Sequence, residues 1–453
     1  MSTFPERAPA ALRRSGAATV DTEARRVAET IVDRVLRGGR AAALREARRH
    51  GELGRGEPLV RDRRDCLRGL ARLARADRDA LARAAARIER FARAQRRSLS
   101  DLTIRTGNAE IGHRVVPLAS AGCYAPGGRY PLPSSALMTA IPARVAGVSS
   151  VTAASPRPVD AMLAAAALAG ADRVLAIGGA QAIALLARGD DEIPRCDVLV
   201  GPGNRYVTAA KAILRERGLV AIDMLAGPSE LLVVADQTAD PDHVAADLLA
   251  QAEHDPASAV WLVSIGRRAA IRACARLDAL LSTLPTATIA RRALRRGGFA
   301  VVASRAEAAR VADALAPEHL AVATRRPTEL LRACRSYGAA FLAPMAEVFG
   351  DYGIGPNHTL PTGGAARTSQ GLSVLDFVRL RPYASGAVRA AVARDTVRLA
   401  HLEGLAAHAA SAALRLTDAP SASRRRAATP RSETASARAS PARATDRTPR
   451  SRP

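Results

Sequence analysis

The stretches Arg-Val-Leu-Ala-Ile-Gly-Gly-Ala-Gln (173–181) and Asp-Val-Leu-Val-Gly-Pro-Gly-Asn (197–204) decide the fold of this chain. Each is a short apolar run that ends in a glycine turn and leads into a helical pattern. Similar units repeat from Val148 onwards, and they predict strands at 150–154, 173–177, 197–200 and 220–223 with helices at 159–169, 180–187 and 206–217 between them. Strands that alternate with helices in this way are typical of a parallel sheet with right-handed crossovers.

A second alternating series begins after Ser229. It predicts strands at 231–235, 259–265, 299–303, 321–324 and 339–342 with helices at 242–253, 267–281, 306–315 and 328–337. Outside both series, the patterns predict helices within 22–97, a hairpin at 102–118 around Gly107, and one helix at 390–415. The sequence therefore predicts an α/β protein with two Rossmann-like domains on parallel sheets, plus small N- and C-terminal helical pieces.

The composition limits the class of protein. A chain of 453 residues with 48% hydrophobic content can build two or more domains, and 3% aromatic content means cores of Ala, Leu, Val and Ile. No apolar run reaches ~18 residues without a charge or proline, so no membrane span is expected. No signal peptide is visible, and the five cysteines form no Cys-x-x-Cys pair. We therefore expect a cytoplasmic protein.

The formal charge of +24 raises the question of nucleic-acid binding. The basic residues are nearly all Arg, with Lys211 the single Lys, and the excess is concentrated in the first hundred residues and the tail. Aromatic side chains that could stack on bases are scarce. We therefore disfavour nucleic-acid binding as the primary role, although a non-enzymatic, nucleic-acid-binding protein stays as one hypothesis. The composition of residues 418–453, rich in Ser, Pro, Ala, Thr and Arg, predicts a disordered basic tail.

Gln251 and His254 stand three positions apart at the end of a predicted helix. This spacing places both side chains on one face, where they could share a metal ion. Imidazole is a common ligand of zinc and its neighbours in the first transition row. A solvated helix end explains the pair equally simply, so the pattern alone leaves both interpretations open.

Glycine-rich loops follow the strands of the first series, where parallel sheets bind ligands. The dinucleotide pattern G-x-G-x-x-G fails after Gly201 and Gly203, because Tyr206 occupies the third glycine position. A helix N-terminus after glycines can still hold a phosphate. Lys211 in the following helix either supplies a point charge to such a ligand or is a lysine left by chance in a chain that otherwise uses arginine. The Gly/Pro loop at 122–135 is either a plain turn or a close backbone approach to a ligand.

Three further clusters carry candidate side chains. Glu318 and His319 are adjacent at a helix-to-strand junction. The loop at 350–364, which begins Gly-Asp351, has a density of glycine and polar groups that favours a functional role. Glu403 and His408 lie five positions apart in the last predicted helix, where solvation is the usual explanation.

Taken together, these clusters resemble one family, the histidinol dehydrogenases, over about 22–416. The resemblance rests on eight motifs in the same order: Cys-Tyr-Ala-Pro-Gly-Gly-Arg-Tyr-Pro (123–131), Gly-Gly-Ala-Gln-Ala-Ile (178–183), Gly-Pro-Gly-Asn-Arg-Tyr-Val-Thr-Ala-Ala-Lys (201–211), Ala-Gly-Pro-Ser-Glu (226–230), Gln-Ala-Glu-His-Asp (251–255), Ala-Pro-Glu-His-Leu (316–320), Gly-Asp-Tyr-Gly-Ile-Gly-Pro-Asn-His-Thr-Leu-Pro-Thr (350–362) and Glu-Gly-Leu-x-x-His (403–408). Such a series is far more specific than any one of its members.

The resemblance implies a homodimeric enzyme with one zinc ion per subunit, which oxidises L-histidinol to L-histidine through histidinal with two NAD⁺, the last steps of histidine biosynthesis. It implies zinc ligands at Gln251, His254, Asp351 and His408, and an acid and base at Glu318 and His319, all six of them also substrate contacts. Ser229 and Glu403 resemble further substrate contacts, and Tyr124, Gln181 and Asn204 resemble the residues on the nucleotide side. Cys123 is expected to be a packed thiol.

The resemblance also implies a division of the chain. Residues 1–21 form an N-terminal arm, 22–123 and 230–371 a discontinuous first α/β domain, and 124–229 a Rossmann-like nucleotide-side domain. Residues 372–417 form a C-terminal helical piece that completes the partner's site. Two departures, Ala250 and Leu225 where Ser and Pro are expected, affect fine specificity. The alternative is a paralogue that oxidises another small alcohol, such as a sulfonated diol, with NAD⁺.

Overall fold

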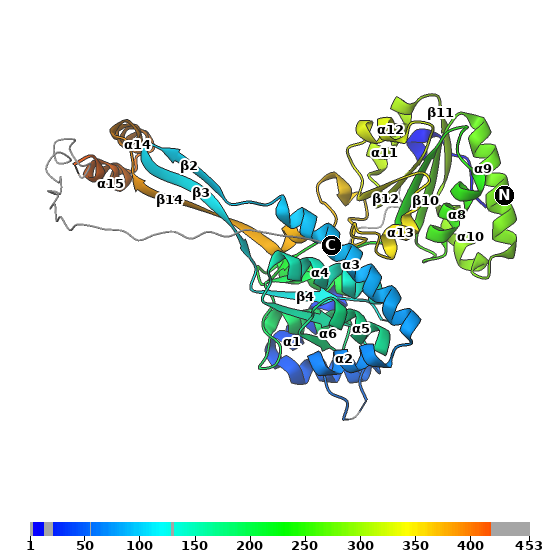
Figure 1. The fold of residues 1–453 in the computed structure, drawn as a ribbon, viewed down its shortest axis with the longest axis horizontal. Helices are drawn as coiled ribbons and strands as arrows, with labels where there is room; N and C mark the ends of the chain where they lie inside the picture. Colours follow the sequence, from blue (N-terminus) through cyan, green and yellow to red (C-terminus); the bar gives the residue numbers. More distant parts are fainter. Residues whose placement is uncertain (1–2, 13–20, 55, 128–130, 418–453) are drawn as a thin grey trace, which may run out of the picture. The chain divides into compact units, whose positions relative to one another are not determined.

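The computed structural model describes residues 3–12, 21–54, 56–127 and 131–417, so the predicted basic tail lies outside the described residues. The chain divides into two compact units, one of Met1–Leu102 with His113–Arg381 and one of Thr103–Gly112 with Pro382–Pro453. The first unit contains two α/β sheets (Figure 1). No helix among the described residues has the length and apolar character needed to cross a membrane.

The first sheet has six strands in the order β1-β6-β5-β4-β7-β8. Their bounds are β1 (Val60–Asp62), β4 (Ser120–Tyr124), β5 (Ser150–Ala154), β6 (Arg173–Leu175), β7 (Val198–Val200) and β8 (Ala221–Ile222). All neighbours are parallel except the edge strand β1, which runs antiparallel to β6. Strand order reverses direction at β4, because β5 and β6 extend to one side and β7 and β8 to the other. The crevice at such a point is where ligands bind in open α/β sheets.

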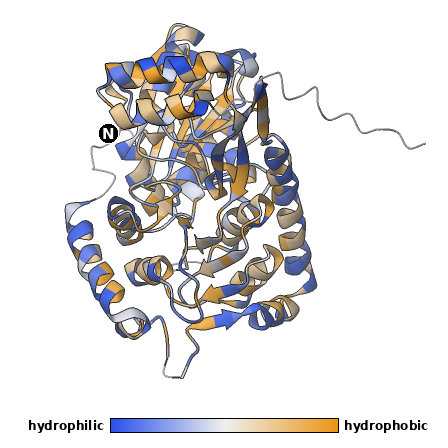
Figure 2. Ribbon diagram, turned by 90° about the vertical axis from the view of Figure 1, so that its left-hand side faces the viewer, coloured by the Kyte–Doolittle hydropathy of each residue, from blue (hydrophilic) through white to orange (hydrophobic). Residues whose placement is uncertain are grey.

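Helices cover both faces of this sheet. One face packs against α2 (Arg63–Arg72), α3 (Arg75–Arg97), α4 (Pro133–Ala146) and α5 (Asp160–Leu168), and the other against α1 (Thr22–Arg49), α6 (Gly179–Arg188) and α7 (Arg205–Glu216). Both cores consist mainly of buried Ala, Leu, Val and Ile side chains, as the composition predicts. The outer helices carry hydrophilic and hydrophobic residues along their length (Figure 2), as amphipathic helices do.

The second sheet has five parallel strands in the order β11-β10-β9-β12-β13. Their bounds are β9 (Glu230–Ala235), β10 (Ala259–Ile265), β11 (Gly298–Val302), β12 (His319–Ala323) and β13 (Ala339–Leu342). One face packs against α8 (Pro241–Ala252), α9 (Arg267–Thr283) and α10 (Ala287–Arg296), and the other against α11 (Arg305–Leu315) and α12 (Pro327–Ala333). The short helix α13 (Glu347–Asp351) follows β13. The two parallel-sheet cores confirm the predicted fold class.

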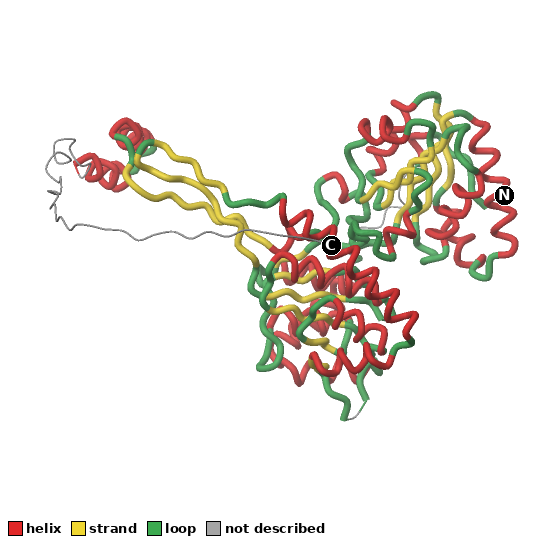
Figure 3. The backbone as a smooth tube through the Cα atoms, in the orientation of Figure 1, coloured by secondary structure: helices red, strands yellow, loops and turns green. Residues whose placement is uncertain are grey.

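A third sheet joins β2 (Leu102–Thr106) and β3 (Asn108–Pro117), the predicted hairpin, to β14 (Val378–Ala387) (Figure 3). Gly107 forms the turn at a φ of 67°, which glycine adopts without strain. The second compact unit contains the tip of this hairpin, part of β14, and the helices α14 (Ala390–Leu402) and α15 (Ala406–Thr417). Short 3₁₀ segments in the described part of the chain are Pro9–Ala11, Ala365–Arg367 and Val374–Phe377.

The structure differs from the sequence-based division of the chain at the N-terminal side. Segment 22–123, expected to accompany 230–371, instead supplies β1 and β4 to the six-stranded sheet. The physical reason is long-range pairing: β4 joins β5 on one side and β7 on the other, and no local pattern encodes such partners. Residues 3–12 also differ from a loose arm, because Phe4 is buried in the core of the second sheet and Arg7 N–H donates to the Phe299 carbonyl at 2.8 Å.

Glycines interrupt the helical pattern at two places, and only the second departs from the predicted helices, because separate helices were expected at 24–36 and 41–48. Helix α1 is kinked at Gly39, whose φ of 54° is outside the helical region, and Arg34 pairs with Glu46 across the kink at 3.0 Å. The expected helix at 390–415 ends at Leu402, because Gly404 takes a φ of 73° between α14 and α15. Glycine ends helices in this left-handed conformation.

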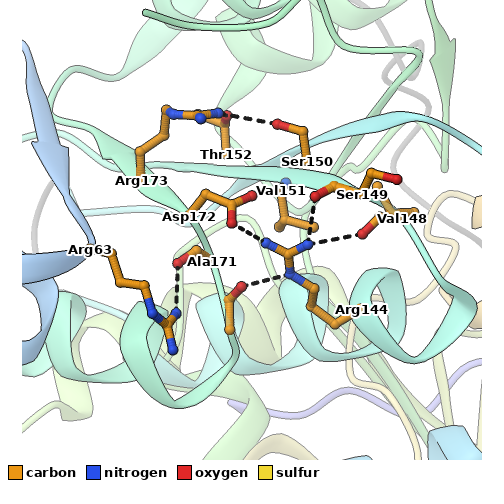
Figure 4. A network of polar contacts seen from close by, with 11 residues as sticks. Arg63, Arg144, Val148, Ser149, Ser150, Val151, Thr152, Ala171, Asp172 and Arg173 are labelled. Atoms are coloured by element: carbon orange, nitrogen blue, oxygen red, sulfur yellow. Dashed lines mark hydrogen bonds and ion pairs between the residues drawn. The ribbon is translucent and has the colours of Figure 1, made fainter.

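A network of polar contacts lies at the amino-terminal ends of β5 and β6 (Figure 4). Arg144, near the end of α4, donates from Nε to the Gly170 carbonyl at 2.6 Å and from one terminal nitrogen to the Val148 and Ser149 carbonyls at 2.9 Å. Its other terminal nitrogen pairs with Asp172. These contacts tie the end of α4 to the segments that lead into β5 and β6.

Candidate active site

A cavity of about 320 Å³ lies among the loops of both sheets in the first unit. Its wall contains all the substrate, metal and catalytic candidates of that unit, namely Ser229, Gln251, His254, Glu318, His319 and Asp351. Residues 202–204 after β7 and 358–362 after α13 complete much of the remaining wall. Part of the loop at 350–364, whose composition favours a functional role, therefore lines the cavity.

Glu318 and His319 are both held by the backbone of Glu230. The Glu230 N–H donates to Glu318 Oε2 at 2.8 Å, and His319 Nδ1 lies 3.0 Å from the Glu230 carbonyl oxygen. Because a carbonyl only accepts, Nδ1 must carry the ring proton in the neutral imidazole, and Nε2 is the basic nitrogen. The parallel pairing of β9 with β12, with Leu231 opposite His319, brings these groups together.

His319 Nε2 is buried and has no hydrogen-bond partner among the described residues, and Asp351 Oδ1 lies 3.9 Å away. Burial lowers the pKa of His319, although the Asp351 carboxylate and the bond to the Glu230 carbonyl oppose this shift. Burial raises the pKa of Glu318 well above its usual range, and the nearby Glu230 and Asp351 carboxylates add to the effect. The pair therefore offers a neutral imidazole base and a carboxyl group whose carboxylate form is unusually basic.

Gln251, His254 and Asp351 meet at the same cavity from two elements. Gln251 is buried in the last turn of α8, His254 follows immediately after this helix, and Asp351 ends α13. Amide, imidazole and carboxylate donors suit zinc and related divalent ions. No group of three or more His, Cys, Asp and Glu side chains in the described part of the chain is arranged to hold a metal ion. The three donors fit a zinc site that needs a further ligand.

A second cavity of about 820 Å³ contains the three nucleotide-side candidates, Tyr124, Gln181 and Asn204, in its wall. It adjoins the first cavity, because Pro126, Leu132, Asn204 and His254 line both. The wall is formed by loops at the carboxyl ends of β4, β5, β6 and β7, so the cavity lies at the point where strand order reverses.

Local contacts position the side chains of this second cavity. The Asn204 side chain caps α7, since Oδ1 accepts from the N–H groups of Tyr206 and Val207 at 3.0 and 3.1 Å. The Tyr124 hydroxyl accepts from the Gly179 N–H at 3.2 Å, and burial raises its pKa to about 12. The backbone at Gly201 passes so close to Tyr124 that a Cβ there would lie 2.1 Å from the Tyr124 carbonyl oxygen.

Lys211 has a structural environment. Its side chain is 2% exposed, its ammonium group pairs with the buried Asp223, and it donates to the Gly201 carbonyl at 3.0 Å. Asp223 Oδ2 in turn accepts from the Gly201 N–H at 2.7 Å. The pair fixes the loop after β7 from beneath. This settles the alternatives left by the sequence: Lys211 contacts the loop and not the cavity.

Sequence reasoning assigned no role to two polar residues that line the cavities. Glu52, in the loop after α1, lines the second cavity, and nothing in its local sequence distinguishes it from a surface glutamate. His358 lines the first cavity, with Nδ1 2.8 Å from the Asp351 carbonyl oxygen. The density of polar residues in its loop was the available signal for His358.

Glu403 and His408 belong to the second compact unit, whereas the other site candidates belong to the first. Within that unit, His408 on α15 lines a surface cavity of about 540 Å³ with apolar neighbours on α14 such as Val392. Cys123 is fully buried in β4, and burial raises the pKa of its thiol to about 12, as expected of a packed thiol.

Comparisons with known proteins give a consistent result. A family model described as histidinol dehydrogenase matches residues 14–416. The histidinol dehydrogenase of Thermus thermophilus is 46% identical over 343 residues, which cover 75% of this chain and 82% of that protein. That of Pseudomonas aeruginosa is 44% identical over 357 residues, covering 77% and 80%. A crystal structure of histidinol dehydrogenase from Elizabethkingia anophelis superposes with a TM-score of 0.86 at 30% identity, covering 93% of this chain and 100% of that one.

Proposed function

This chain belongs to the histidinol dehydrogenase family, and on this premise we propose that it oxidises L-histidinol to L-histidine through histidinal, with two NAD⁺ as oxidants. The observation that carries the proposal is the environment of His319. Its Nδ1 is committed to the Glu230 carbonyl, and its Nε2 is an unpartnered base on the wall of the smaller cavity. A group that must take a proton from an alcohol needs this arrangement.

In the first half-reaction, His319 Nε2 accepts the hydroxyl proton of histidinol while hydride leaves the same carbon for the nicotinamide. The products are histidinal and NADH. The nicotinamide must lie where the two cavities share their wall, near Asn204 and His254, because hydride transfer requires contact between cofactor and substrate. Tyr124 and Gln181 belong to the wall of the cofactor cavity only, and we assign them to cofactor binding.

In the second half-reaction, the Glu318 carboxylate accepts a proton from water as the water oxygen bonds to the aldehyde carbon, and His319 returns the proton of the first half-reaction to the aldehyde oxygen. The resulting gem-diol transfers hydride to a second NAD⁺ and a proton to His319. The sum converts alcohol, water and two NAD⁺ into carboxylate, two NADH and three protons. The raised pKa of Glu318 supports this role, because a carboxylate with a high pKa is a stronger base than an exposed glutamate.

We propose that Gln251, His254 and Asp351 hold a zinc ion together with His408 of the partner subunit. When bound, zinc would orient the amino alcohol and polarise its oxygen. Ser229 and the partner subunit's Glu403 would contact the substrate. Side chains on α14 and α15 support a homodimer: Leu399, Leu402 and Leu414 are 58%, 69% and 66% exposed, as expected of an apolar surface that a second copy covers.

The experiment that tests the proposal is NAD⁺ reduction by purified protein with L-histidinol and with a panel of small alcohols that includes a sulfonated diol. We expect turnover of histidinol, loss of activity after chelation, and recovery on addition of Zn²⁺. Turnover of another alcohol but not of histidinol would replace the proposal with the paralogue alternative. A truncation after Asp418 should keep full activity, because the tail lies outside the family match.

A further inference from the structure

Three cavities adjoin one another through shared residues. The cofactor cavity shares Asn204 and His254 with the substrate cavity, and it shares Glu52 and Arg157 with a third, polar cavity of about 360 Å³. A dinucleotide in the middle cavity must direct its nicotinamide to the substrate side. Its adenosine half must therefore extend toward the boundary formed by Glu52 and Arg157.

Glu52 is held rigidly at this boundary. Its Oε2 accepts from the Gly178 N–H at 3.0 Å and from Gln181 Nε2 at 3.1 Å. Its Oε1 accepts no hydrogen bond from any described residue. Since one oxygen fixes the carboxylate and the other stays uncommitted on a cavity wall, Glu52 offers a preformed acceptor for a ligand hydroxyl.

Ribose hydroxyls are donors that such an acceptor recognises. In Rossmann-type sites an acidic side chain accepts from the ribose of NAD and disfavours the 2′-phosphate of NADP, although there the acid comes from a strand end within the βαβ unit. Glu52 instead comes from the loop between α1 and the edge strand β1. We infer that Glu52 Oε1 accepts from the adenosine ribose hydroxyls and selects NAD⁺ over its 2′-phosphorylated counterpart. The inference rests on the proposed use of a nicotinamide dinucleotide.

Positive charge is present at the same boundary. Neither Arg157 nor Arg61, which lines the third cavity, has an ion-pair partner among the described residues. Arg157 borders the cofactor cavity, so its guanidinium group can serve the pyrophosphate that NAD⁺ and NADP⁺ share, whereas Arg61 lines the third cavity and not the cofactor cavity. Glu52 is the group on this wall that acts on the part that differs.

The test compares Glu52→Gln, Glu52→Asp and Glu57→Gln in the full chain. Glu57 is the matched control, because it lines the third cavity without lining the cofactor cavity. For each protein, kcat and KM are measured with NAD⁺ and with NADP⁺ at saturating histidinol. Binding of ADP-ribose and 2′-phospho-ADP-ribose is measured by calorimetry without substrate. Gln keeps an oxygen for the Gly178 N–H, so it removes charge with little loss of anchoring.

We expect Glu52→Gln to lower the preference for NAD⁺ over NADP⁺, in KM more than in kcat, by at least ~10-fold. Glu52→Asp should keep most of the preference for NAD⁺ over NADP⁺, and Glu57→Gln should leave this preference unchanged. A role confined to holding Gln181 would weaken both cofactors equally and leave the ratio unchanged, which would overturn the inference. Binding of 2′-phospho-ADP-ribose as tight as that of ADP-ribose in the unmodified protein would also overturn it. The ratio of the affinities for ADP-ribose and 2′-phospho-ADP-ribose can be measured even if histidinol is not the substrate. Failure of the proposed function can therefore be distinguished from failure of this inference.

Discussion

The two sheets of the first unit differ in how they use charge. At the carboxyl ends of the six-stranded sheet, Lys211 and Asp223 neutralise each other in the interior and hold the backbone of a glycine loop. At the amino ends of β9 and β12 in the five-stranded sheet, His319 Nε2 is buried and unpartnered in the described chain, and burial raises the pKa of Glu318. In the six-stranded half, the buried charges hold a loop in place. In the five-stranded half, the buried ionisable groups are arranged for the proposed proton transfer. Buried groups without partners are costly, so they indicate function.

The difference between the two sheets is tested most directly at His319. Replacing it in His319→Asn removes the basic nitrogen and leaves an amide that can donate to the Glu230 carbonyl. We expect kcat to fall by ~10²–10⁴-fold with the KM for NAD⁺ changed by less than about twofold. Steady-state kinetics measure this, with His243→Asn, an exposed position on α8, as control. A fall of less than tenfold would remove His319 from the proton-transfer role.

Lys211 tests the other half. Lys211→Met leaves the Asp223 carboxylate buried without its partner, and breaking such a pair costs ~3–5 kcal/mol of stability. Chemical denaturation followed by circular dichroism measures the loss, with Arg215→Met on the exposed face of α7 as control. A loss below about 1 kcal/mol would show that the loop after β7 does not depend on this pair.

Glu347 on α13 makes the stability of the five-stranded half depend on pH. It is 2% exposed, neither carboxyl oxygen has a hydrogen-bond partner among the described residues, and burial raises its pKa to about 8, with Asp247 adding to the shift. The folded state therefore holds its proton more tightly than the unfolded state, so stability falls as pH rises from about 4.5 to about 8.

In Glu347→Gln this loss should disappear, with a gain of a few kcal/mol at pH 9, at about 1.4 kcal/mol per pKa unit, and little change at pH 4.5. Thermal midpoints measured with chelator present, across this pH range, test it. Parallel pH profiles for the two proteins would contradict the burial of a protonated Glu347.

The smallest expected effect compares two helix caps. Asn204 caps α7 on the wall of both cavities, and Asp240 caps α8 in the other half by accepting from the Asp242 N–H at 2.8 Å. Each change to Ala should cost ~1 kcal/mol of stability. Only Asn204→Ala should also raise the KM for NAD⁺, because Asn204 lines both cavities. Equal KM values for NAD⁺ in the two variants would show that Asn204 does not take part in cofactor binding.

The fold class and many of the elements could be predicted from the sequence, because strand and helix periodicity are local. Strand partners could not: β4 is a five-residue strand whose place depends on β5 and β7, far along the chain. The helix α10 was missed because its Arg-rich sequence resembles a solvated segment, although Ala290 and Leu294 are buried.

Candidate site residues within long motifs could be named from the sequence, as Glu318 and His319 were, and the structure places both on the wall of the smaller cavity. The sequence could not show that the Glu230 backbone fixes both, because a backbone contact leaves no trace in side-chain identity. Glu52 escaped for a related reason, since its partners Gly178 and Gln181 lie more than a hundred positions away.

The central claim is that one half of this unit binds the oxidant and the other carries out two successive oxidations on a single substrate. The most direct test is to count NADH formed per L-histidinol consumed by the purified, zinc-loaded protein with excess NAD⁺. Two NADH per histidinol, with histidine as the product, is the predicted result. One NADH per histidinol with release of the aldehyde, or no turnover by the folded protein, would contradict the account.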